Sequence, residues 1–346
     1  MFLISLQLTN FRNYARLNLN FDHKPTILLG NNAAGKSNLL ESIYLLSTTK
    51  SIRVEKEEEL ILSGESFSRV EGLIEDRGEE TGLIVILQKA NKKVLVNGVS
   101  RRVVDFFGLL PAVIFYPQNI NMITGSPSLR RWHLDLSLSQ VDLEYKKSLT
   151  SYEQFLTSRN RVVKRIREGL SKYDELEYWT KELINTGEII SRKRTLFFSF
   201  LNGIEHPLGD FKFIFNPNLL TKERLEQYKT SEVAAGATLI GPHRDDFSFY
   251  LKDRFLAHFG SRGEQRTATL AFELATLEFM AQVYGKRPIL LLDDIFSELD
   301  SPHRNKILEI IPRQQTVIAT VELENIPKSF LDSARILQVE DGKILV

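Results

Sequence analysis

A glycine-rich segment near the start of the chain has the residue types that bind the phosphates of a nucleotide. It runs Gly30-Asn-Asn-Ala-Ala-Gly35-Lys36-Ser37 and fits the pattern G-x-x-x-x-G-K-S/T at every fixed position. Glycines let the backbone curve around phosphate oxygens, and the start of a following helix adds a favourable dipole. We expect Lys36 to reach the β- and γ-phosphates and Ser37 to ligate Mg²⁺. The predicted nucleotide contacts are Gly30, Asn31, Asn32, Ala33, Ala34, Gly35, Lys36 and Ser37.

Two adjacent aspartates follow an apolar run far along the chain. The run 289–292 is typical of a strand buried on both faces, and Asp293 and Asp294 come directly after it. A phosphate loop needs a metal-binding acid on a neighbouring strand, so we assign Asp293 to Mg²⁺. Asp294 is placed to orient or deprotonate a water molecule, which makes Asp294 and Lys36 the candidate catalytic residues. A solvated Asp-Asp turn is the alternative interpretation of this pair.

The periodicity of apolar residues predicts the elements that must position these side chains. Towards the N-terminus it predicts strands over 2–8, 16–21, 26–29, 67–74, 82–87 and 112–116, and a helix over 38–46. Helical spacing dominates 126–201, followed by a short strand over 211–215. Towards the C-terminus it predicts strands over 247–251, 255–258, 288–292 and 316–319, helices over 267–283 and 303–311, and a hairpin over 334–346. We therefore expect an α/β head made from residues 1–118 and 230–346, with an inserted helical lobe over 119–229.

Composition narrows the class of protein. The 346 residues include 45 Lys plus Arg against 44 Asp plus Glu, a net charge of +1 that excludes a uniformly basic nucleic-acid binder but not a local basic patch. The chain has no cysteine, which excludes a disulfide scaffold, a cysteine nucleophile and a thiolate zinc site. Neither a targeting segment nor a run of about 18 apolar residues is visible, so we expect a cytoplasmic protein that does not bind membranes.

The segment before the last long helix carries a resemblance to ABC-type ATPases. Ser261, Gly263 and Gln265 occupy the positions of the S-x-G-x-Q signature, and Ser297-Glu-Leu-Asp300 resembles the D-loop of that family. With the phosphate loop and the two aspartates, these motifs have the order and spacing of the family. The resemblance implies an ABC-type P-loop ATPase head. It also implies an ATP-dependent head-to-head homodimer, in which the signature of one subunit caps the nucleotide of the other.

Finer features resemble the RecF family, bacterial recombination mediators related to SMC-type heads. They are Asn10-Phe-Arg12-Asn13-Tyr14, Gly125-Ser-Pro-Ser-Leu-Arg-Arg131, Gly241-Pro-His-Arg-Asp-Asp246 and an Asp-Asp pair in place of Asp-Glu. The match spans nearly the whole chain and adds Arg12 and Asn13 to the nucleotide site. It implies a weak, DNA-dependent ATPase that uses ATP mainly as a switch and binds single-strand gaps or single-strand/duplex junctions. It further implies that the mediators RecR and RecO cooperate in loading recombinase during DNA repair.

At three places the sequence does not settle the role of a residue. Thr320, Val321 and Glu322 follow a predicted strand without the histidine of the ABC switch position. Gln118 is our candidate for the Q-loop contact to Mg²⁺, with a simple turn residue as the alternative. For His243 we favour a structural turn over catalysis, because a Gly-Pro pair precedes it.

Basic side chains are concentrated in the expected lobe. The stretch 159–167 contains five cations and no acid, and 192–194 adds three more. Such clusters neutralise phosphates without reading base sequence. A solvated helix face is the alternative, since acidic residues follow closely. The predicted DNA contacts are Arg130, Arg131, Arg159, Arg161, Lys164 and Arg165.

Three other functions share the phosphate loop. An ABC transporter's ATPase subunit is one, although the stretch between Ser37 and Ser261 is longer than such subunits have. An architectural SMC-type ATPase is another, although the chain lacks long heptad arms. A phosphotransferase would use the same loop to move a phosphate to a small acceptor.

Overall fold

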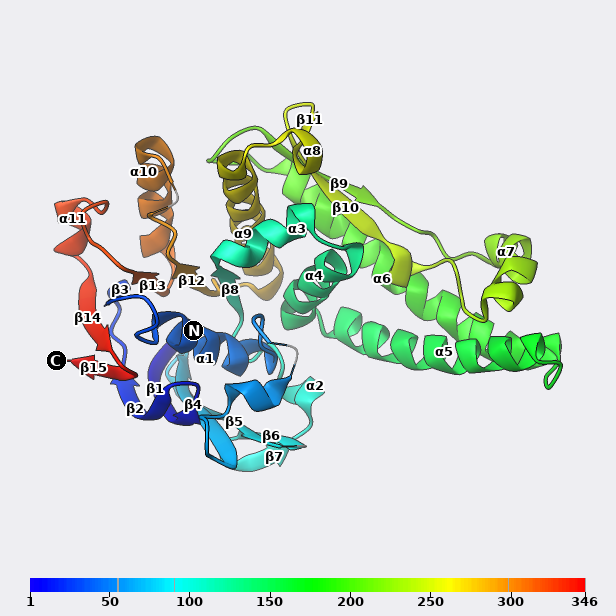
Figure 1. Cartoon of the computed structure of the whole chain (residues 1–346), viewed down its shortest axis with the longest axis horizontal. Coiled ribbons are helices and arrows are strands. Elements are labelled where there is room, and N and C mark those ends of the chain that lie inside the picture. Colours follow the sequence, from blue (N-terminus) through cyan, green and yellow to red (C-terminus); the bar gives the residue numbers. More distant parts are fainter. Residues whose placement is uncertain (55, 90, 298, 346) are drawn as a thin grey trace. The chain divides into compact units, whose positions relative to one another are not determined.

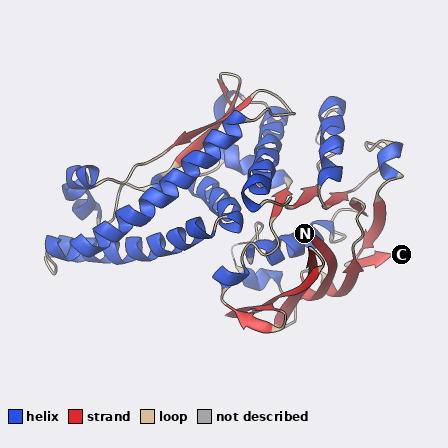
Figure 2. Cartoon of the chain, turned by 180° about the vertical axis from the view of Figure 1, so that it is seen from behind, coloured by secondary structure: helices blue, strands red, loops and turns tan. Residues whose placement is uncertain are grey.

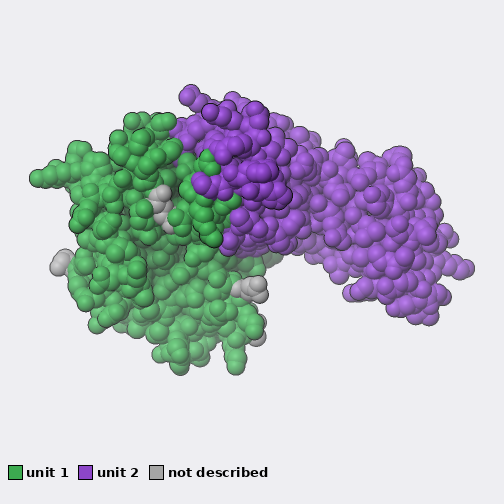
Figure 3. Space-filling view, turned by 45° about the horizontal axis from the view of Figure 1, so that its top comes forward, with its two compact units in different colours: residues 1–120, 262–346 green, residues 121–261 purple. Residues whose placement is uncertain are grey.

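The computed structural model of the chain describes residues 1–54, 56–89, 91–297 and 299–345, in two compact units (Figure 3). Unit 1 comprises residues 1–120 and 262–346, and unit 2 comprises residues 121–261. Both ends of the chain contribute to unit 1. Unit 2 extends beyond the expected end of the lobe at 229, because strand β9 (Phe211–Asn216) pairs along its whole length with β10 (Asp246–Leu251).

An antiparallel sheet forms one layer of unit 1 (Figure 1), with the strand order β2-β1-β4-β5-β6-β7. Its strands are β1 (Phe2–Phe11), β2 (Tyr14–Asn20), β4 (Phe67–Asp76), β5 (Glu79–Gln88), β6 (Asn91–Val96) and β7 (Val99–Arg101). Buried positions alternate with more accessible ones along β4, so one face of this strand enters the core. Asn97 and Gly98 both have positive φ, 49° and 77°, as the tight turn between β6 and β7 requires.

A mainly parallel sheet forms the second layer, with the order β15-β14-β3-β13-β12-β8. Its strands are β3 (Thr26–Leu29), β8 (Ala112–Phe115), β12 (Ile289–Asp293), β13 (Thr316–Thr320), β14 (Arg335–Glu340) and β15 (Lys343–Leu345). Strands β3, β13, β12 and β8 run parallel and are almost entirely buried, as their continuous apolar sequences predict. Their carboxyl ends therefore meet at one edge, which is where ligands bind in open α/β sheets.

Helix α1 (Lys36–Thr48) contacts strands of both sheets and is buried along most of its length. Its side chains Leu40 and Ile43 belong to one apolar cluster together with Val70 of β4 and Leu291 of β12. Burial of apolar surface stabilises a fold by about 25 cal/mol per Å². This shared core fixes α1 and therefore the loop that leads into it.

Shorter elements and outer helices complete unit 1. They are α2 (Val103–Phe106), α9 (Arg262–Tyr284), α10 (Ser301–Ile310), α11 (Lys328–Leu331), η1 (Glu57–Leu60), η2 (Pro117–Ile120) and η5 (Ile311–Arg313). Helix α9 packs against β8 and η2. None of the helices in the described part of the chain is long and apolar enough to span a membrane.

Unit 2 is built mainly from helices (Figure 2). They are α3 (Asn121–Thr124), α4 (Pro127–Val141), α5 (Leu143–Arg167), α6 (Glu177–Gly203), α7 (Lys222–Ala235), α8 (Leu256–Phe259), η3 (Tyr173–Leu176) and η4 (Pro242–Arg244). Asp142 separates α4 from α5, because its carboxylate accepts a hydrogen bond of 2.9 Å from the backbone N–H of Tyr145 and caps α5. The long helices α5 and α6 pack against each other.

A small sheet with the order β11-β10-β9 completes unit 2. The strand expected over 255–258 is wrong, because β11 covers only Arg254–Phe255 and α8 begins at Leu256. The backbone N–H of Gly260 bonds the carbonyl oxygen of Leu256 at 3.1 Å and closes this helical turn. A run of four mostly apolar residues does not distinguish a strand from a helical turn by periodicity alone.

Candidate nucleotide-binding site

The phosphate loop connects β3 to α1, and its two fixed glycines meet different needs of the backbone. A Cβ atom at Gly30 would lie 2.2 Å from the carbonyl oxygen of Val339, so only glycine fits there. Gly35 has a φ of +119°, which L side chains rarely adopt. Because Gly35 also has no side chain to cap α1, the first backbone N–H groups of that helix are left for an anion.

The Lys36 ammonium lies inside this loop. It donates hydrogen bonds to the carbonyl oxygens of Gly30 at 2.7 Å and of Asn31 at 2.8 Å. Burial lowers the pKa of Lys36, while the carboxylates of Asp293 and Asp294 act in the opposite direction. Its present partners are uncharged carbonyl groups, so phosphate oxygens could replace them with stronger, charge-assisted bonds.

The side chains of Ser37 and Asp293 are in direct contact, although they come from opposite ends of the chain. The hydroxyl of Ser37 donates to Oδ1 of Asp293 at 2.9 Å. Burial raises the pKa of Asp293, and the Ser37 hydroxyl and the Arg53 guanidinium only partly oppose this effect. A cation near this buried carboxyl group would favour its ionised form. Carboxylate oxygens are also ligands that suit Mg²⁺. The residues present therefore fit a Mg²⁺ held by Ser37, Asp293 and phosphate oxygens.

Asp294 begins the turn beyond β12 and is held in an uncommon conformation. Its φ is 49°, in the left-handed region. Its backbone N–H donates to the carbonyl oxygen of Ala319 in β13 at 2.9 Å, and its own carbonyl oxygen accepts from the Ser297 hydroxyl at 2.9 Å. Aspartate tolerates this region better than most residues, so the conformation makes a sharp turn directly after β12. The structure thus places Asp294 at the same sheet edge as the phosphate loop.

The expected D-loop follows, and its Glu298 lies outside the described residues. Asp300 accepts a hydrogen bond of 3.0 Å from the backbone N–H of His303 and caps α10. At the end of β13, the buried Thr320 donates to the carbonyl oxygen of Glu322 at 2.9 Å. The position that lacks the ABC switch histidine is therefore a tight turn at the same edge of the sheet.

Gln118 lies exposed in η2, just beyond β8. Strands β8 and β12 pair in parallel, with Phe115 beside Leu292. Gln118 and Asp293 therefore follow neighbouring strands at the same edge, which is the placement that a shared metal contact requires.

Arg12 and Asn13, which the family resemblance adds to the nucleotide site, have different partners. Asn13 donates from Nδ2 to the carbonyl oxygen of Ala34 at 3.1 Å and accepts from Asn38 at 2.8 Å, so it braces the phosphate loop. Arg12 makes a two-pronged pair with the fully buried Glu41 of α1, at 2.9 and 3.0 Å. In this structure the Arg12 guanidinium is held by Glu41.

The signature residues surround the start of α9. Ser261 and Gly263 are exposed, whereas Gln265 is buried. A Cβ atom at Gly263 would meet nothing within 4 Å in the described part of the chain, so local packing does not require glycine there. Open space at the beginning of a long helix leaves room for an anionic group from another molecule.

Two of the predicted DNA contacts are paired with carboxylates in unit 2. Arg159 is 4% exposed and donates to Glu232 at 2.7 Å and to the Thr238 hydroxyl at 2.6 Å. Arg130 is 9% exposed and makes a two-pronged pair with Asp246, at 2.6 and 3.0 Å. Because both guanidinium groups are buried on carboxylates, we correct the interpretation of Arg130 and Arg159 as DNA contacts and assign them a structural role.

Two of the three cations in the run 192–194 also have internal partners, which the sequence did not reveal, whereas Arg192 is exposed. Arg194 is 1% exposed and lies 2.7 Å from both Asp135 and Asp245. Lys193 pairs with Asp142 at 2.6 Å. Asp245 and Asp246, at the end of the Gly241–Asp246 motif, were the sequence signal for this pairing. Acidic side chains that become buried need cationic partners.

The remaining predicted DNA contacts differ in exposure. Arg131 is partly buried and donates to the carbonyl oxygen of Asp245 at 2.8 Å, and burial lowers its pKa. Arg161, Lys164 and Arg165 are exposed near the end of α5. These three side chains form the exposed basic face of α5.

His243 is part of the internal framework of unit 2. Its Nδ1 lies 2.7 Å from the Tyr152 hydroxyl, and its Nε2 lies 3.2 Å from the carbonyl oxygen of Thr238. Burial lowers the pKa of His243 to about 4, so the ring is neutral near pH 7. These contacts agree with the structural turn that the sequence analysis favours.

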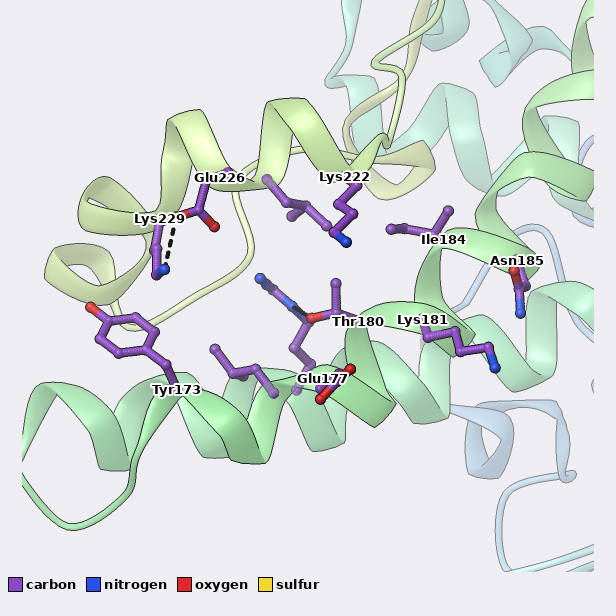
Figure 4. A pocket seen from close by; sticks show the side chains of 12 residues that line it. Tyr173, Glu177, Thr180, Lys181, Ile184, Asn185, Lys222, Glu226 and Lys229 are labelled. Carbon is purple, nitrogen blue, oxygen red and sulfur yellow. Dashed lines mark hydrogen bonds and ion pairs between the residues drawn. The ribbon is translucent and has the colours of Figure 1, made fainter.

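Unit 2 also contains a cavity of about 470 Å³ between α5, η3, α6 and α7 (Figure 4). Apolar side chains such as Leu176 and Ile184 line part of it. Lys229 bonds Glu226 at 2.8 Å and lies 4.8 Å from the centre of the Tyr173 ring. The cavity has no glycine loop at a helix start, so we assign the nucleotide to the phosphate loop of unit 1 instead.

Comparison with known proteins extends this description. The family model of the RecF/RecN/SMC N terminal domain matches residues 2–342. The chain is 34% identical to the DNA replication and repair proteins RecF of Bacillus cereus and Bacillus anthracis, over 99% of this chain and 98% of each relative. It is also similar to the solved structure of the recombination mediator protein RecF with ATP, with a TM-score of 0.89 and 29% identity over 99% of this chain and 97% of that one.

A more distant likeness concerns the fold alone. The SMC head domain of Pyrococcus furiosus is 16% identical to this chain, with a TM-score of 0.55, and the match covers 99% of this chain and 96% of that one. This likeness and the RecF structure confirm the ABC-type α/β fold expected from the sequence. The RecF matches cover nearly all of the chain, so they extend far beyond the phosphate loop that many nucleotide-binding proteins share. The chain therefore belongs to the RecF family, within the wider RecF/RecN/SMC family.

Proposed function

We propose that this protein is an ATP-dependent DNA-binding protein of recombinational DNA repair, in which ATP acts as a switch. The observation that carries the proposal is the phosphate loop, which holds the Lys36 ammonium and brings Ser37 to 2.9 Å from Asp293. The names of the relatives, DNA replication and repair protein RecF, and the ATP-bound RecF structure support it.

The loop residues would hold the phosphates of ATP. Backbone N–H groups at the start of α1 would face the phosphates, and Lys36 would exchange its carbonyl partners for phosphate oxygens. Ser37 and Asp293 would hold Mg²⁺ together with Gln118 of η2, which follows the neighbouring strand β8. When bound, this ion neutralises phosphate charge and orients the γ-phosphate.

Hydrolysis would depend on Asp294, which is placed at the sheet edge to orient the attacking water. Its side chain is one methylene shorter than the glutamate usual in ABC-type ATPases, so its reach to water is shorter. We therefore expect slow hydrolysis, which suits a switch better than a motor. We further propose that hydrolysis depends on DNA, as the resemblance to RecF implies.

Dimerisation would be gated by ATP. In a head-to-head dimer, Ser261, Gly263 and Gln265 of one subunit cap the nucleotide held by the other. The open space over Gly263 supports this role, because nothing in the described part of its own chain accounts for the glycine. Loss of the γ-phosphate removes the group that bridges the two subunits and opens the dimer.

DNA would bind through exposed cations of the lobe. The exposed basic face of α5, formed by Arg161, Lys164 and Arg165, offers sequence-independent contacts to phosphates. We propose single-strand gaps and single-strand/duplex junctions as the preferred DNA. We further propose cooperation with RecR and RecO in loading recombinase.

The test is a titration of fluorescent gapped duplex DNA, followed by anisotropy, with ATP·Mg²⁺, with ADP·Mg²⁺ and without nucleotide. We expect ATP to raise the affinity for gapped DNA at least tenfold over ADP, and intact duplex to bind more weakly. Equal binding in all three nucleotide states would contradict the proposal, as would a wild-type protein that binds no ATP.

A further inference from the structure

The signature helix α9 has one charged residue in its buried middle. All ten residues of 268–277 are buried, and Glu273 is 6% exposed. Among the described residues, no basic side chain contributes to its ionisation. A buried carboxyl group without a cation is costly, so packing alone would favour an apolar residue at this position.

Asn119 provides the hydrogen-bond partner of Glu273. Its Nδ2 donates to Oε1 of Glu273 at 2.7 Å, and Asn119 is 1% exposed. Asn119 directly follows Gln118 in η2, and α9 packs against η2. The bond therefore joins the helix that begins at the signature to the loop that carries Gln118.

Two tyrosines complete the surroundings of Glu273. Burial, and secondarily the Glu273 carboxyl, raise the pKa values of Tyr44 on α1 and Tyr116 beside β8, so both phenols are neutral near pH 7. Burial also raises the pKa of Glu273 to about 8, with only the Asn119 hydrogen bond opposing it. Glu273 is then mostly protonated near pH 7, and its carbonyl oxygen accepts from Asn119.

We propose that Glu273 is a positioning residue, a neutral hydrogen-bond acceptor on α9 that holds Asn119 and thereby sets the position of Gln118 beside the metal site. This inference rests on the proposed function, which gives Gln118 and the signature their roles. Helix α9 is continuous from Arg262 to Tyr284, so a displacement at the signature moves Glu273 about three turns away. When the signature contacts the nucleotide of the other subunit, the bond between Glu273 and Asn119 would transmit the change to Gln118. Binding at the dimer interface would thereby affect the metal site of the same chain.

The test is the Mg²⁺ dependence of binding of a fluorescent ATP analogue to wild type, Glu273→Met and Glu273→Gln. Methionine removes the acceptor, whereas glutamine keeps a neutral acceptor of the same shape. We expect the half-saturating Mg²⁺ concentration to rise about tenfold in Glu273→Met, as for loss of one buried hydrogen bond, and to stay within about twofold in Glu273→Gln. Binding of the analogue in EDTA should be equal in all three. Glu278→Gln, on the same helix but paired with Arg287 at 2.9 Å near the surface, is the matched control and should behave as wild type.

Asn119→Ala removes the same bond from the other side and keeps the test available if Glu273→Met does not fold. It should shift the Mg²⁺ dependence by a similar factor, and the double variant should shift it no further. A folded Glu273→Met or Asn119→Ala protein with the wild-type Mg²⁺ dependence would overturn the inference. It would also be overturned if Glu273→Gln shifted as far as Glu273→Met, because the bond would then require a carboxylate. A wild-type protein that binds no analogue would instead overturn the proposed function.

Discussion

The phosphate loop of unit 1 and the arginine-rich interior of unit 2 hold their cations by different means. In the loop, Lys36 is carried by a local backbone shape, and its partners are carbonyl oxygens a few residues away. In unit 2, Arg159 and Arg194 are held by carboxylates that come from distant parts of the chain. A ligand can replace carbonyl groups around one cation, but it cannot replace a buried carboxylate without leaving that carboxylate unpaired. The first arrangement suits the binding of a ligand, and the second suits stability.

Buried acids show the same contrast. Glu232 in unit 2 is balanced by the Arg159 guanidinium at 2.7 Å. Glu273 in unit 1 has only the amide of Asn119, and burial raises its pKa to about 8. Glu232 is therefore paired with a cation, whereas Glu273 is kept neutral near pH 7. Glu41 of unit 1, which is fully buried and paired with Arg12, follows the first arrangement.

The strongest test of this contrast is Arg159→Ala. It leaves the Glu232 carboxylate buried without its cation, so we expect the free energy of unfolding to fall by about 3–5 kcal/mol. Arg161→Ala, an exposed cation on the same helix, is the matched control and should change it by about 0.5 kcal/mol or less. Urea denaturation followed by circular dichroism measures both values. Equal stabilities of the two variants would show that the buried pair is not structural.

A second test uses pH to identify the neutral acid. The pKa of Glu273 is about 8 in the folded chain and 4.5 as its ordinary value. Between these values the unfolded chain loses the proton while the folded chain keeps it, so this group lowers stability as pH rises. Glutamine has no proton to lose. The stability of Glu273→Gln relative to wild type should therefore rise from pH 5 to pH 8, by at most about 1.4 kcal/mol per pH unit, and then level off.

Urea denaturation of both proteins at pH 5, 6.5, 8 and 9 makes this comparison. Glu278→Gln, whose carboxylate is paired near the surface, should not show the same rise. A stability difference between Glu273→Gln and wild type that is independent of pH would contradict the neutral acid.

Lys36→Ala tests the cation of the phosphate loop, whose partners are carbonyl groups and not carboxylates. Loss of charge-assisted bonds to phosphate costs about 1.5–3 kcal/mol, so ATP affinity should fall roughly 100-fold in calorimetric titrations. The melting temperature without nucleotide should change little, because the partners of Lys36 are exchangeable carbonyl groups. A variant that still binds ATP and dimerises would contradict the role given to this lysine.

The smallest expected effect concerns the exposed basic face of α5. The triple variant Arg161→Ala, Lys164→Ala and Arg165→Ala should bind gapped DNA about tenfold more weakly at low salt and remain as stable as wild type. The slope of log affinity against log salt should become shallower by up to about 0.9 for each lost phosphate contact. An unchanged slope would place the DNA on another surface.

The phosphate loop could be predicted because its chemistry is local. Two glycines five positions apart, a lysine and a serine fix both the backbone shape and the kind of ligand, and β3 and α1 flank them as the sequence predicts. The turns at Asn97 and Asp341 are of the same kind, since both residues have positive φ, 49° and 43°.

The inner arginines could not be predicted in this way. Spacing along α5 shows that Arg159 and Arg161 are two residues apart, but not that Glu232 will return to only one of them. Only the tertiary structure determines which basic side chains lie next to a carboxylate. Glu273 was missed for the same reason, because its partner Asn119 lies 154 positions away in the chain. A glutamate within an otherwise uncharged, buried helical stretch is the signal that could have drawn attention to it.

The most direct test of the central claim, that ATP bound at the phosphate loop joins two heads through their signatures, is sedimentation velocity with ATP·Mg²⁺ and with ADP·Mg²⁺. The account predicts a dimer with ATP and a monomer with ADP for wild type. It also predicts that Ser261→Arg binds ATP in a parallel titration but remains a monomer. Identical sedimentation of wild type with the two nucleotides, or a Ser261→Arg protein that dimerises with ATP as wild type does, would contradict it.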